Sequence, residues 1–160
     1  MGFKRFTHEF YIHNYETGKH KQATPISILH YLEETALSHT ESVGLGIDRM
    51  KADGTAWILN RWSVRTNRYP CWKEKIVVET WPSSFRRFYA TREFYIKDAN
   101  ENIIVRASSL WVYLNILKKR PLRIPEYFGE LYGVTYNLAV ENPFKSFHFL
   151  LYPTVRKSSQ

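Results

Sequence analysis

The sequence contains a single cysteine, Cys71, among its 160 residues. The chain therefore cannot form an internal disulfide or a cysteine-rich zinc site, which fits a reducing, intracellular setting. It has no run of about 18 apolar residues of the kind that spans a membrane as a helix, and the N-terminal MGFKRFTHEF lacks the apolar stretch of a signal peptide. We therefore expect a cytoplasmic protein without a membrane span.

Internal repeats and low-complexity segments are also absent, and a chain of 160 residues indicates one domain. Aromatic side chains are abundant, with eleven Tyr, ten Phe and five Trp. They favour strands, where large flat side chains pack well, and a hydrophobic content of 44% provides for a core. The formal net charge of +8 suits an anionic partner, for which nucleic acid, anionic lipid and an acidic protein are candidates.

One segment has the periodicity of a helix, and several have that of strands. Thr24 suits an N-cap, Pro25 a first helical position and Gly44 a C-terminal stop, so we expect a helix that runs to Val43. Residues 43–47 and 52–54 are expected to be loops, and 118–130, with two prolines, to be irregular. Alternating bulky and polar residues predict strands at 6–15, 55–68, 75–81, 85–98 and 103–116.

The predicted helix has an apolar stripe that needs a sheet to bury it. The stripe consists of Ile28, Leu29, Leu32, Thr35, Ala36, His39 and Val43. Because this is the only good helix among long strands, we expect an α+β hotdog fold, in which a long antiparallel sheet wraps around one central helix.

Seven short motifs occur in one order along the chain. They are YETG (15–18), HYLEETALSHTESVG (30–44), WILNRWSV (57–64), RYPCW (68–72), VETW (78–81), RASSLWVYLN (106–115) and RIPE (123–126). At this spacing they resemble the N-terminal hotdog half of the acyl-acyl-carrier-protein (acyl-ACP) thioesterases of plants and bacteria. The resemblance implies an enzyme of fatty acid biosynthesis that hydrolyses fatty acyl-ACP to free fatty acid, with the acyl thioester and the carrier protein as partners.

The same resemblance implies a hotdog domain over residues 1–126, followed at 127–160 by a linker or the start of a second hotdog. FHFLLY (147–152) resembles the first strand of such a unit. The family's catalytic Asp-x-Asn-x-His stretch belongs to the second hotdog and does not occur in this sequence. A lone hotdog exposes sheet edges, so we expect a homodimer or a missing partner domain. The alternative to an enzyme is a non-catalytic acyl-binding or regulatory module.

Glu16 and His20 are the catalytic candidates that this sequence itself offers. With Gly18 they keep the spacing of Asp-x-Asn-x-His, and a carboxylate can hold a histidine as the base that activates water. Glycine replaces the asparagine of the motif, so the amide is missing. We therefore favour the alternative interpretation, in which this segment is an ordinary turn.

Other polar residues also suggest chemistry. His30, Glu34 and Glu41 have the spacing of metal ligands, but they fall opposite the apolar stripe, so we expect a solvated face and no metal or cofactor. Cys71 has no histidine near it in sequence, which favours a structural thiol over a nucleophile.

Two larger sets of residues are candidates for binding. Candidates for the wall of an acyl pocket are Leu29, Leu32, Ala36, His39, Trp57, Leu59 and Trp111. We expect His39 to be a core or pocket-wall histidine rather than a catalyst. Candidates for docking an acidic carrier protein are Arg61, Arg65, Arg86, Arg87, Lys118, Lys119 and Arg120, and Arg68 and Arg92 belong to the same excess of positive charge. Nucleic acid is the rival partner for these basic, aromatic strands, but no recognised nucleic-acid motif accompanies them.

Overall fold

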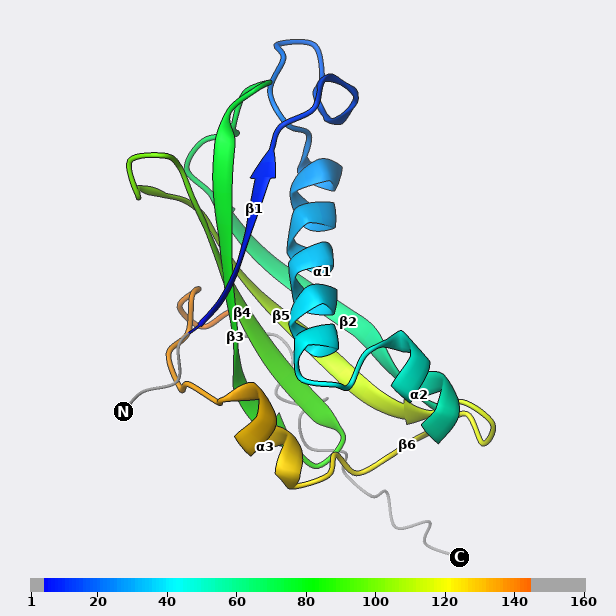
Figure 1. Ribbon diagram of the computed structural model, residues 1–160. Coiled ribbons are helices and arrows are strands. Elements are labelled where there is room, and N and C mark those ends of the chain that lie inside the picture. Colours follow the sequence, from blue (N-terminus) through cyan, green and yellow to red (C-terminus); the bar gives the residue numbers. More distant parts are fainter. Residues whose placement is uncertain (1–4, 145–160) are drawn as a thin grey trace, which may run out of the picture.

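The computed structural model describes residues 5–144. Within this range one long helix, α1 (Pro25–Ser42), lies along a curled antiparallel sheet (Figure 1). The strand order across the sheet is β1-β3-β4-β5-β2, and β6 pairs with β5. The strands are β1 (Phe6–Tyr11), β2 (Thr55–Thr66), β3 (Lys75–Arg86), β4 (Tyr89–Lys97), β5 (Ile103–Asn115) and β6 (Arg120–Pro121). The expected α+β hotdog architecture is confirmed.

Helix α1 begins where the sequence predicts. The side chain of Thr24 accepts a hydrogen bond from the backbone N–H of Ser27 at 3.1 Å, and Pro25 occupies the first turn, where its missing N–H has no cost. The helix ends before Gly44, whose φ of +78° suits glycine. These local signals fix the start and direction of the helix that the sheet encloses.

Replacing Thr24 with alanine is expected to lower the free energy of unfolding by about 1 kcal/mol, because the N-cap acceptor is lost. Urea denaturation followed by circular dichroism measures this loss. Thr24→Ser is the matched control, since its hydroxyl can accept the same bond. A Thr24→Ala protein as stable as the wild type would show that the cap contributes nothing.

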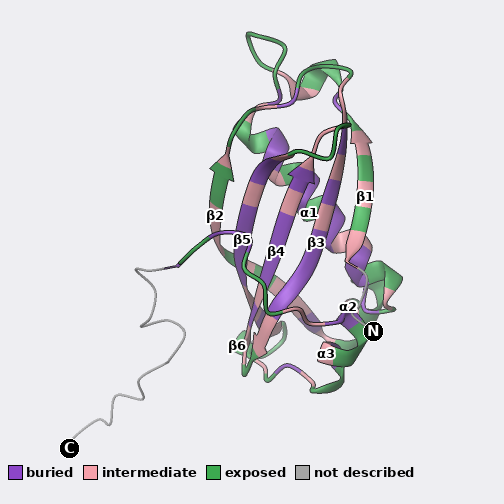
Figure 2. Cartoon of the chain, turned by 90° about the vertical axis from the view of Figure 1, so that its left-hand side faces the viewer, coloured by how far each residue is buried: buried purple, intermediate pink, exposed green. Residues whose placement is uncertain are grey.

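The main core lies between α1 and the concave face of the sheet. Leu32 of α1 and Phe94 and Ile96 of β4 are fully shielded from solvent. In Figure 2 the central strands β3, β4 and β5 are largely buried, whereas the edge strands β1 and β2 are mostly intermediate or exposed. A second cluster lies near the C-terminal end of α1. Its buried members are Leu45, Ala90, Tyr113, Ile124, Phe128 and Tyr132.

Two expectations about loops and turns were wrong. The segment after α1 contains a helix, α2 (Ile47–Asp53), which begins after Gly46 and stops at Gly54 in the left-handed conformation. The carboxylate of Glu41 accepts a hydrogen bond from the N–H of Ile47 at 3.1 Å and so satisfies one free donor at its start. Seven residues flanked by glycines are too short to show a helical period.

Strand β3 is longer than predicted, because it continues through Pro82 instead of ending there. The register shifts between Pro82 and Ser84, which marks a β-bulge. A bulge admits a proline into a strand and bends it. The hairpin turn therefore falls after Arg86, and β4 starts only at Tyr89. The first strand, by contrast, is shorter than expected, since a 3-10 turn (Asn14–Glu16) follows it.

The segment expected to be irregular contains β6 and a further helix, α3 (Tyr127–Tyr132), which packs Phe128 and Tyr132 into the second cluster. The chain then crosses the outer face of the sheet. Its hydrogen bonds there run from Thr135 N–H to the Pro82 carbonyl (3.0 Å) and from Trp81 Nε1 to the Asn137 carbonyl (2.9 Å). FHFLLY (147–152) lies outside the described residues.

Candidate functional site

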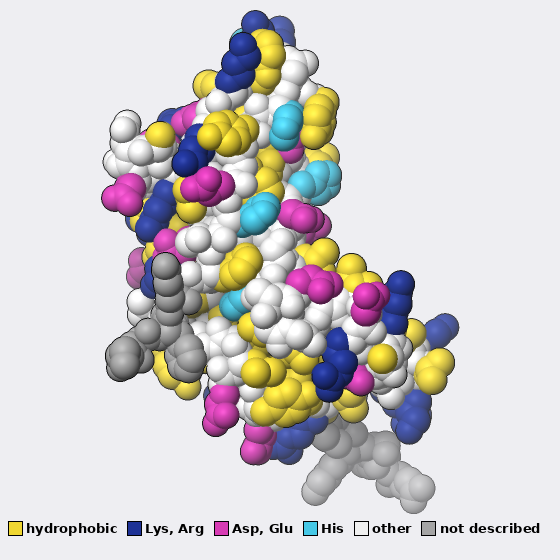
Figure 3. Space-filling model, viewed as in Figure 1, with side chains coloured by type: hydrophobic (Ala, Val, Ile, Leu, Met, Phe, Trp, Pro, Cys, Tyr) yellow, Lys and Arg dark blue, Asp and Glu magenta, His cyan; other side chains and the backbone are white. Residues whose placement is uncertain are grey.

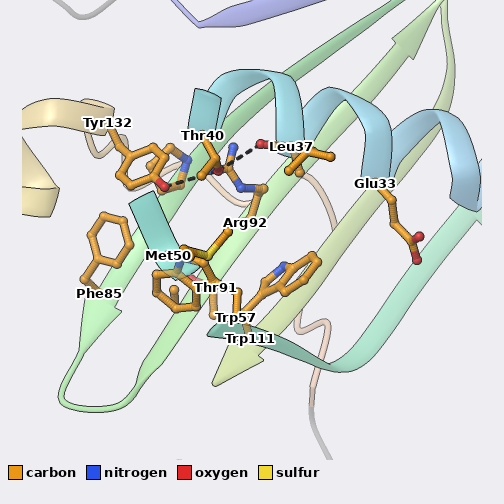
Figure 4. A pocket seen from close by; sticks show the side chains of 13 residues that line it. Glu33, Leu37, Thr40, Met50, Trp57, Phe85, Thr91, Arg92, Trp111 and Tyr132 are labelled. Atoms are coloured by element: carbon orange, nitrogen blue, oxygen red, sulfur yellow. Dashed lines mark hydrogen bonds between the residues drawn. The ribbon is translucent and has the colours of Figure 1, made fainter. Parts of the chain in front are cut away.

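A cavity of about 160 Å³ lies between the C-terminal half of α1 and the sheet (Figure 4). Helix α1 contributes Ala36, Leu37 and Thr40, at the spacing of one helical face. The opposite walls are largely aromatic and come from several elements. They are Met50 of α2, Trp57 of β2, Phe85 of β3, Trp111 of β5 and Tyr132 of α3. The shape and chemistry of this cavity suit an apolar chain.

Among the described residues that line this cavity, Arg92 of β4 is the one cationic side chain. Figure 4 shows it rising from the sheet toward α1, close to Thr40 and Tyr132. The residue is only 8% exposed, and its Nη1 donates to Nδ1 of His39 at 3.0 Å and to Thr80 Oγ1 at 3.2 Å. Burial lowers the pKa of Arg92 to about 10, so the guanidinium is charged at neutral pH.

His39 lies behind the cavity, within the core. Its ring stacks on Phe6 (centroids 5.0 Å apart) and meets Tyr132 edge-on (5.2 Å). Burial and the charge of Arg92 lower the pKa of His39 to about 3. The imidazole is therefore neutral at physiological pH and accepts the hydrogen bond from Arg92. A histidine with these contacts positions Arg92.

The next residue of β4, Glu93, points to the other face of the sheet, since neighbouring side chains of a strand alternate. It is completely buried there and accepts hydrogen bonds from Ser108 Oγ (2.5 Å), Ser83 Oγ (3.2 Å) and Ala139 N–H (3.0 Å). Burial raises the pKa of Glu93 above its ordinary value, against the effect of these donors. Glu93 anchors the segment that crosses the outer face.

The predicted acyl-pocket residues separate into two groups. The structure brings Ala36, Trp57 and Trp111 together in the cavity wall. Leu32 and His39 are buried in the core, Leu29 packs against its edge, and Leu59 is half-buried on β2. The residues that line the cavity therefore do not include Leu29, Leu32, His39 or Leu59.

Glu16 and His20 lie in the loop before α1. The carboxylate of Glu16 accepts a hydrogen bond from the backbone N–H of His13 at 2.9 Å and lies 2.8 Å from Nδ1 of the same residue. Burial alone would raise the pKa of Glu16, but the bonds from His13 hold it below its usual value. His20 is exposed, and in residues 5–144 no hydrogen bond or ion pair joins it to Glu16.

His30, Glu34 and Glu41 are all exposed on α1, away from its buried stripe. Glu41 caps α2, and the described part of the chain contains no group of three His, Cys, Asp or Glu side chains that could hold a metal ion. Cys71 is exposed in the turn before β3.

The predicted docking residues occupy two regions. Arg61 and Arg65 are on β2, whereas the others lie at the β3–β4 hairpin and the connection after β5. The Ile124 N–H donates to the Arg87 carbonyl at 2.8 Å and holds the segment after β6 against the hairpin. Figure 3 shows Lys and Arg side chains at the top, along the left edge and toward the lower right of the visible face, with acidic side chains interspersed among them.

Two arginines counted with this positive charge were assigned wrongly. Arg68 forms ion pairs with Glu74 and with Asp98 (3.1 Å), so its charge is neutralised locally. Arg92 is in the interior because the concave face of β4 is covered by α1 and α3. The strand alternation of FRRFYATREFY did not show which face would be covered.

The sequence-based reasoning missed Thr40, Phe85, Arg92 and Tyr132 as residues of the cavity wall. A signal existed for Thr40, which lies one turn beyond Ala36 on the same face of the helix. Tyr132 comes from a segment expected to be irregular, and Phe85 from a strand continued by a bulge, so no local pattern placed them there.

The family model of the acyl-ACP thioesterase N-terminal domain matches residues 3–132. The chain belongs to the acyl-ACP thioesterase family. It is 33% identical over 128 residues to the palmitoyl-acyl carrier protein thioesterase of Arabidopsis thaliana, and 30% identical over 136 residues to the oleoyl-acyl carrier protein thioesterase 2 of the same plant. These alignments cover 76% and 81% of this chain.

Solved structures of the acyl-ACP thioesterase family share the fold. The 12:0-ACP thioesterase from Umbellularia californica superposes with a TM-score of 0.74 at 27% identity, over 89% of this chain and 59% of that one. The acyl-ACP thioesterase from Bacteroides thetaiotaomicron gives a TM-score of 0.78 at 23% identity, over 86% and 56% of the two chains. The latter likeness is one of fold.

The chain spans only part of its acyl-ACP thioesterase relatives. It covers 31% of the palmitoyl-ACP thioesterase and 37% of the oleoyl-ACP thioesterase of Arabidopsis. The names of both assign those plant proteins to the chloroplast, whereas a cytoplasmic location for this chain stays a prediction. Within residues 5–144, no helix is both long and apolar enough to cross a bilayer.

Proposed function

We propose that this chain supplies the acyl-binding hotdog of an enzyme that hydrolyses fatty acyl-ACP to free fatty acid. The observation that carries the proposal is the cavity between α1 and the sheet, whose walls are largely aliphatic and aromatic. Membership of the thioesterase family supports the substrate class. Relatives named for palmitoyl-ACP and oleoyl-ACP act on thioesters of long acyl chains.

Thioester hydrolysis needs a base that activates water against the carbonyl. The described lining of the cavity includes no histidine, cysteine or serine, and its one carboxylate, Glu33, is exposed. The role of the cavity is therefore to hold the acyl chain and exclude water from it. In this proposal the base comes from the Asp-x-Asn-x-His stretch of a second hotdog unit.

The carrier protein is the proposed partner of the exposed basic connections. Arg87 is exposed at the β3–β4 hairpin, and Lys118, Lys119 and Arg120 are exposed where the chain passes from β5 into β6. Complementary charge speeds encounter with an acidic protein and orients it. Docking at this end would place the carrier beside the end of α1 that borders the cavity.

Filling the cavity from α1 tests the proposal. Ala36→Met is expected to weaken binding of the longest acyl-ACPs by roughly tenfold and to shift the preference of the protein toward shorter chains, because the added atoms occupy the acyl path. The measurement is binding of a series of acyl-ACPs, with free fatty acid released from each determined in the same samples. Ala52→Met on α2 is the matched control, since Ala52 is exposed and does not line the cavity.

An unchanged chain-length profile in Ala36→Met would overturn the assignment of the cavity to the acyl chain. Binding of acyl-ACP without release of fatty acid by the 160-residue chain would make this chain a non-catalytic acyl-binding module. That second candidate rests on the described lining of the cavity, in which the one carboxylate, Glu33, is exposed.

A further inference from the structure

Arg92 places an unneutralised positive charge inside the protein. Its hydrogen-bond partners are His39 and Thr80, and its guanidinium lies 5.4 Å from the ring of Tyr132. All three partners are uncharged at neutral pH. Glu93, the adjacent carboxylate in sequence, is directed to the opposite face of the sheet. Among the described residues, Arg92 forms no ion pair with any carboxylate.

A buried charge without a counter-ion is costly, and a well-packed apolar side chain would serve the core better. The guanidinium has five N–H donors in a planar fork. Both hydrogen bonds that it makes within residues 5–144 use Nη1, so the donors on Nη2 and Nε are available to an acceptor that enters the cavity. A carboxylate is the acceptor whose geometry matches the fork.

The rest of the cavity selects what can carry that carboxylate. Leu37, Trp57 and Trp111 present apolar surface, and Thr40 and Tyr132 already satisfy each other through a 3.2 Å hydrogen bond. The part of the lining that lies within residues 5–144 includes one acidic side chain, Glu33, which is exposed and lies away from Arg92 in Figure 4. A small polar anion would leave the apolar walls unused, whereas an uncharged alkyl chain would leave the guanidinium without a counter-ion.

We propose that the cavity binds a free fatty acid with its carboxylate on Arg92 and its alkyl chain along the aromatic wall. This inference goes beyond the proposed function, because the acyl group of a thioester substrate has no free carboxylate. The fatty acid enters head first, in the orientation opposite to that of an acyl chain whose thioester stays with the carrier. The fatty acid competes with the acyl chain of the substrate for the same space. The protein therefore responds to the product of the proposed reaction.

Isothermal titration of the 160-residue chain with octanoate, 1-octanol and methyl octanoate tests the proposal. Octanoate is expected to bind at least roughly tenfold more tightly than either uncharged ligand, since only the carboxylate forms an ion pair with Arg92 and offers two charged oxygens to its N–H donors. Equal affinities for octanoate and 1-octanol would overturn the proposal. This comparison uses the wild-type protein and does not depend on the folding of any variant.

Variants locate the site. Arg92→Met is expected to abolish the preference for octanoate, and Arg92→Lys to retain part of it. Arg123→Met is the matched control, because Arg123 is exposed between β6 and α3, and it should leave the preference unchanged. Ala36→Met, which fills the cavity, should weaken octanoate binding, whereas unchanged binding would mean a surface site and would overturn the proposal.

Failure of this inference is distinguishable from failure of the proposed function. Acyl-ACP binding with a chain-length profile that Ala36→Met alters would uphold the acyl pocket, even where octanoate shows no preference over 1-octanol. Preferential octanoate binding without acyl-ACP binding would uphold the fatty acid site alone.

Discussion

Replacing Phe94 with alanine is expected to lower the free energy of unfolding by about 3–5 kcal/mol, the range for removing a buried phenyl ring from a well-packed core. Phe94 is 0% exposed and projects from the centre of β4 toward α1. Its ring lies 5.3 Å from that of Trp62, between centroids, and its strand neighbours on either side are Thr80 and Ala107. These neighbours are held by the sheet and cannot move in to fill the space.

Urea denaturation followed by tryptophan fluorescence measures the effect of Phe94→Ala. Tyr136→Ala is the matched control, because it also removes an aromatic ring, but from a side chain that is 85% exposed. Its expected change in stability is within about 0.5 kcal/mol. A loss below about 1 kcal/mol for Phe94→Ala would show that α1 does not close on this part of the sheet.

The elements that the sequence predicts well are those whose local signals and burial agree. Thr24 and Pro25 mark the start of α1, and the inward stripe of that helix includes Leu32, which is fully buried. Long alternating segments likewise predict β2 and β5 within two residues at each end. Apolar residues recur along a helix or strand because one of its faces is buried, so the sequence pattern and the packing in the structure have the same cause.

The elements that were mispredicted depend on contacts that hydrophobic periodicity does not record. Helix α2 is short, and its start is supported by the carboxylate of Glu41, a residue of the preceding helix. Strand β3 continues past Pro82 because the partner strand β4 accommodates a bulge there and the Pro82 carbonyl accepts a hydrogen bond from Thr135. Pro82 and Thr135 are far apart in the sequence, so no local window contains both partners of that contact.

The residues of the cavity wall also divide into those that a local sequence pattern predicts and those that only the packing places there. A helical wheel indicates that Leu32 and Ala36 both point inward, and both belong to the core, yet only Ala36 also lines the cavity. The difference arises from what lies opposite each residue on the sheet, which the wheel does not contain. Arg92 is the clearest case. An arginine in a strand of basic and aromatic residues suggests an exposed face, and only the packing of α1 and α3 places it inside.

The buried histidine beside Arg92 predicts how stability depends on pH. The pKa of His39 is about 3 in the folded protein, against an ordinary value of 6.5, because of burial and the charge of Arg92. As the pH falls below 6.5, the unfolded chain takes up a proton at His39 that the folded chain does not, so stability decreases as pH falls and continues to decrease down to the folded pKa. Between pH 6.5 and 4.5 this group is expected to cost about 2–3 kcal/mol of unfolding free energy.

Comparing wild type with His39→Gln isolates this contribution, because glutamine does not titrate and its amide oxygen can still accept from Arg92. Urea denaturation between pH 7 and pH 4.5 should show the wild type losing about 2–3 kcal/mol more than the variant over this range. His30→Gln is the matched control, since it removes an exposed imidazole from the same helix. Parallel pH profiles for wild type and His39→Gln would mean that His39 is not held neutral against Arg92, and the positive charge at the cavity wall would then lack the acceptor that orients it.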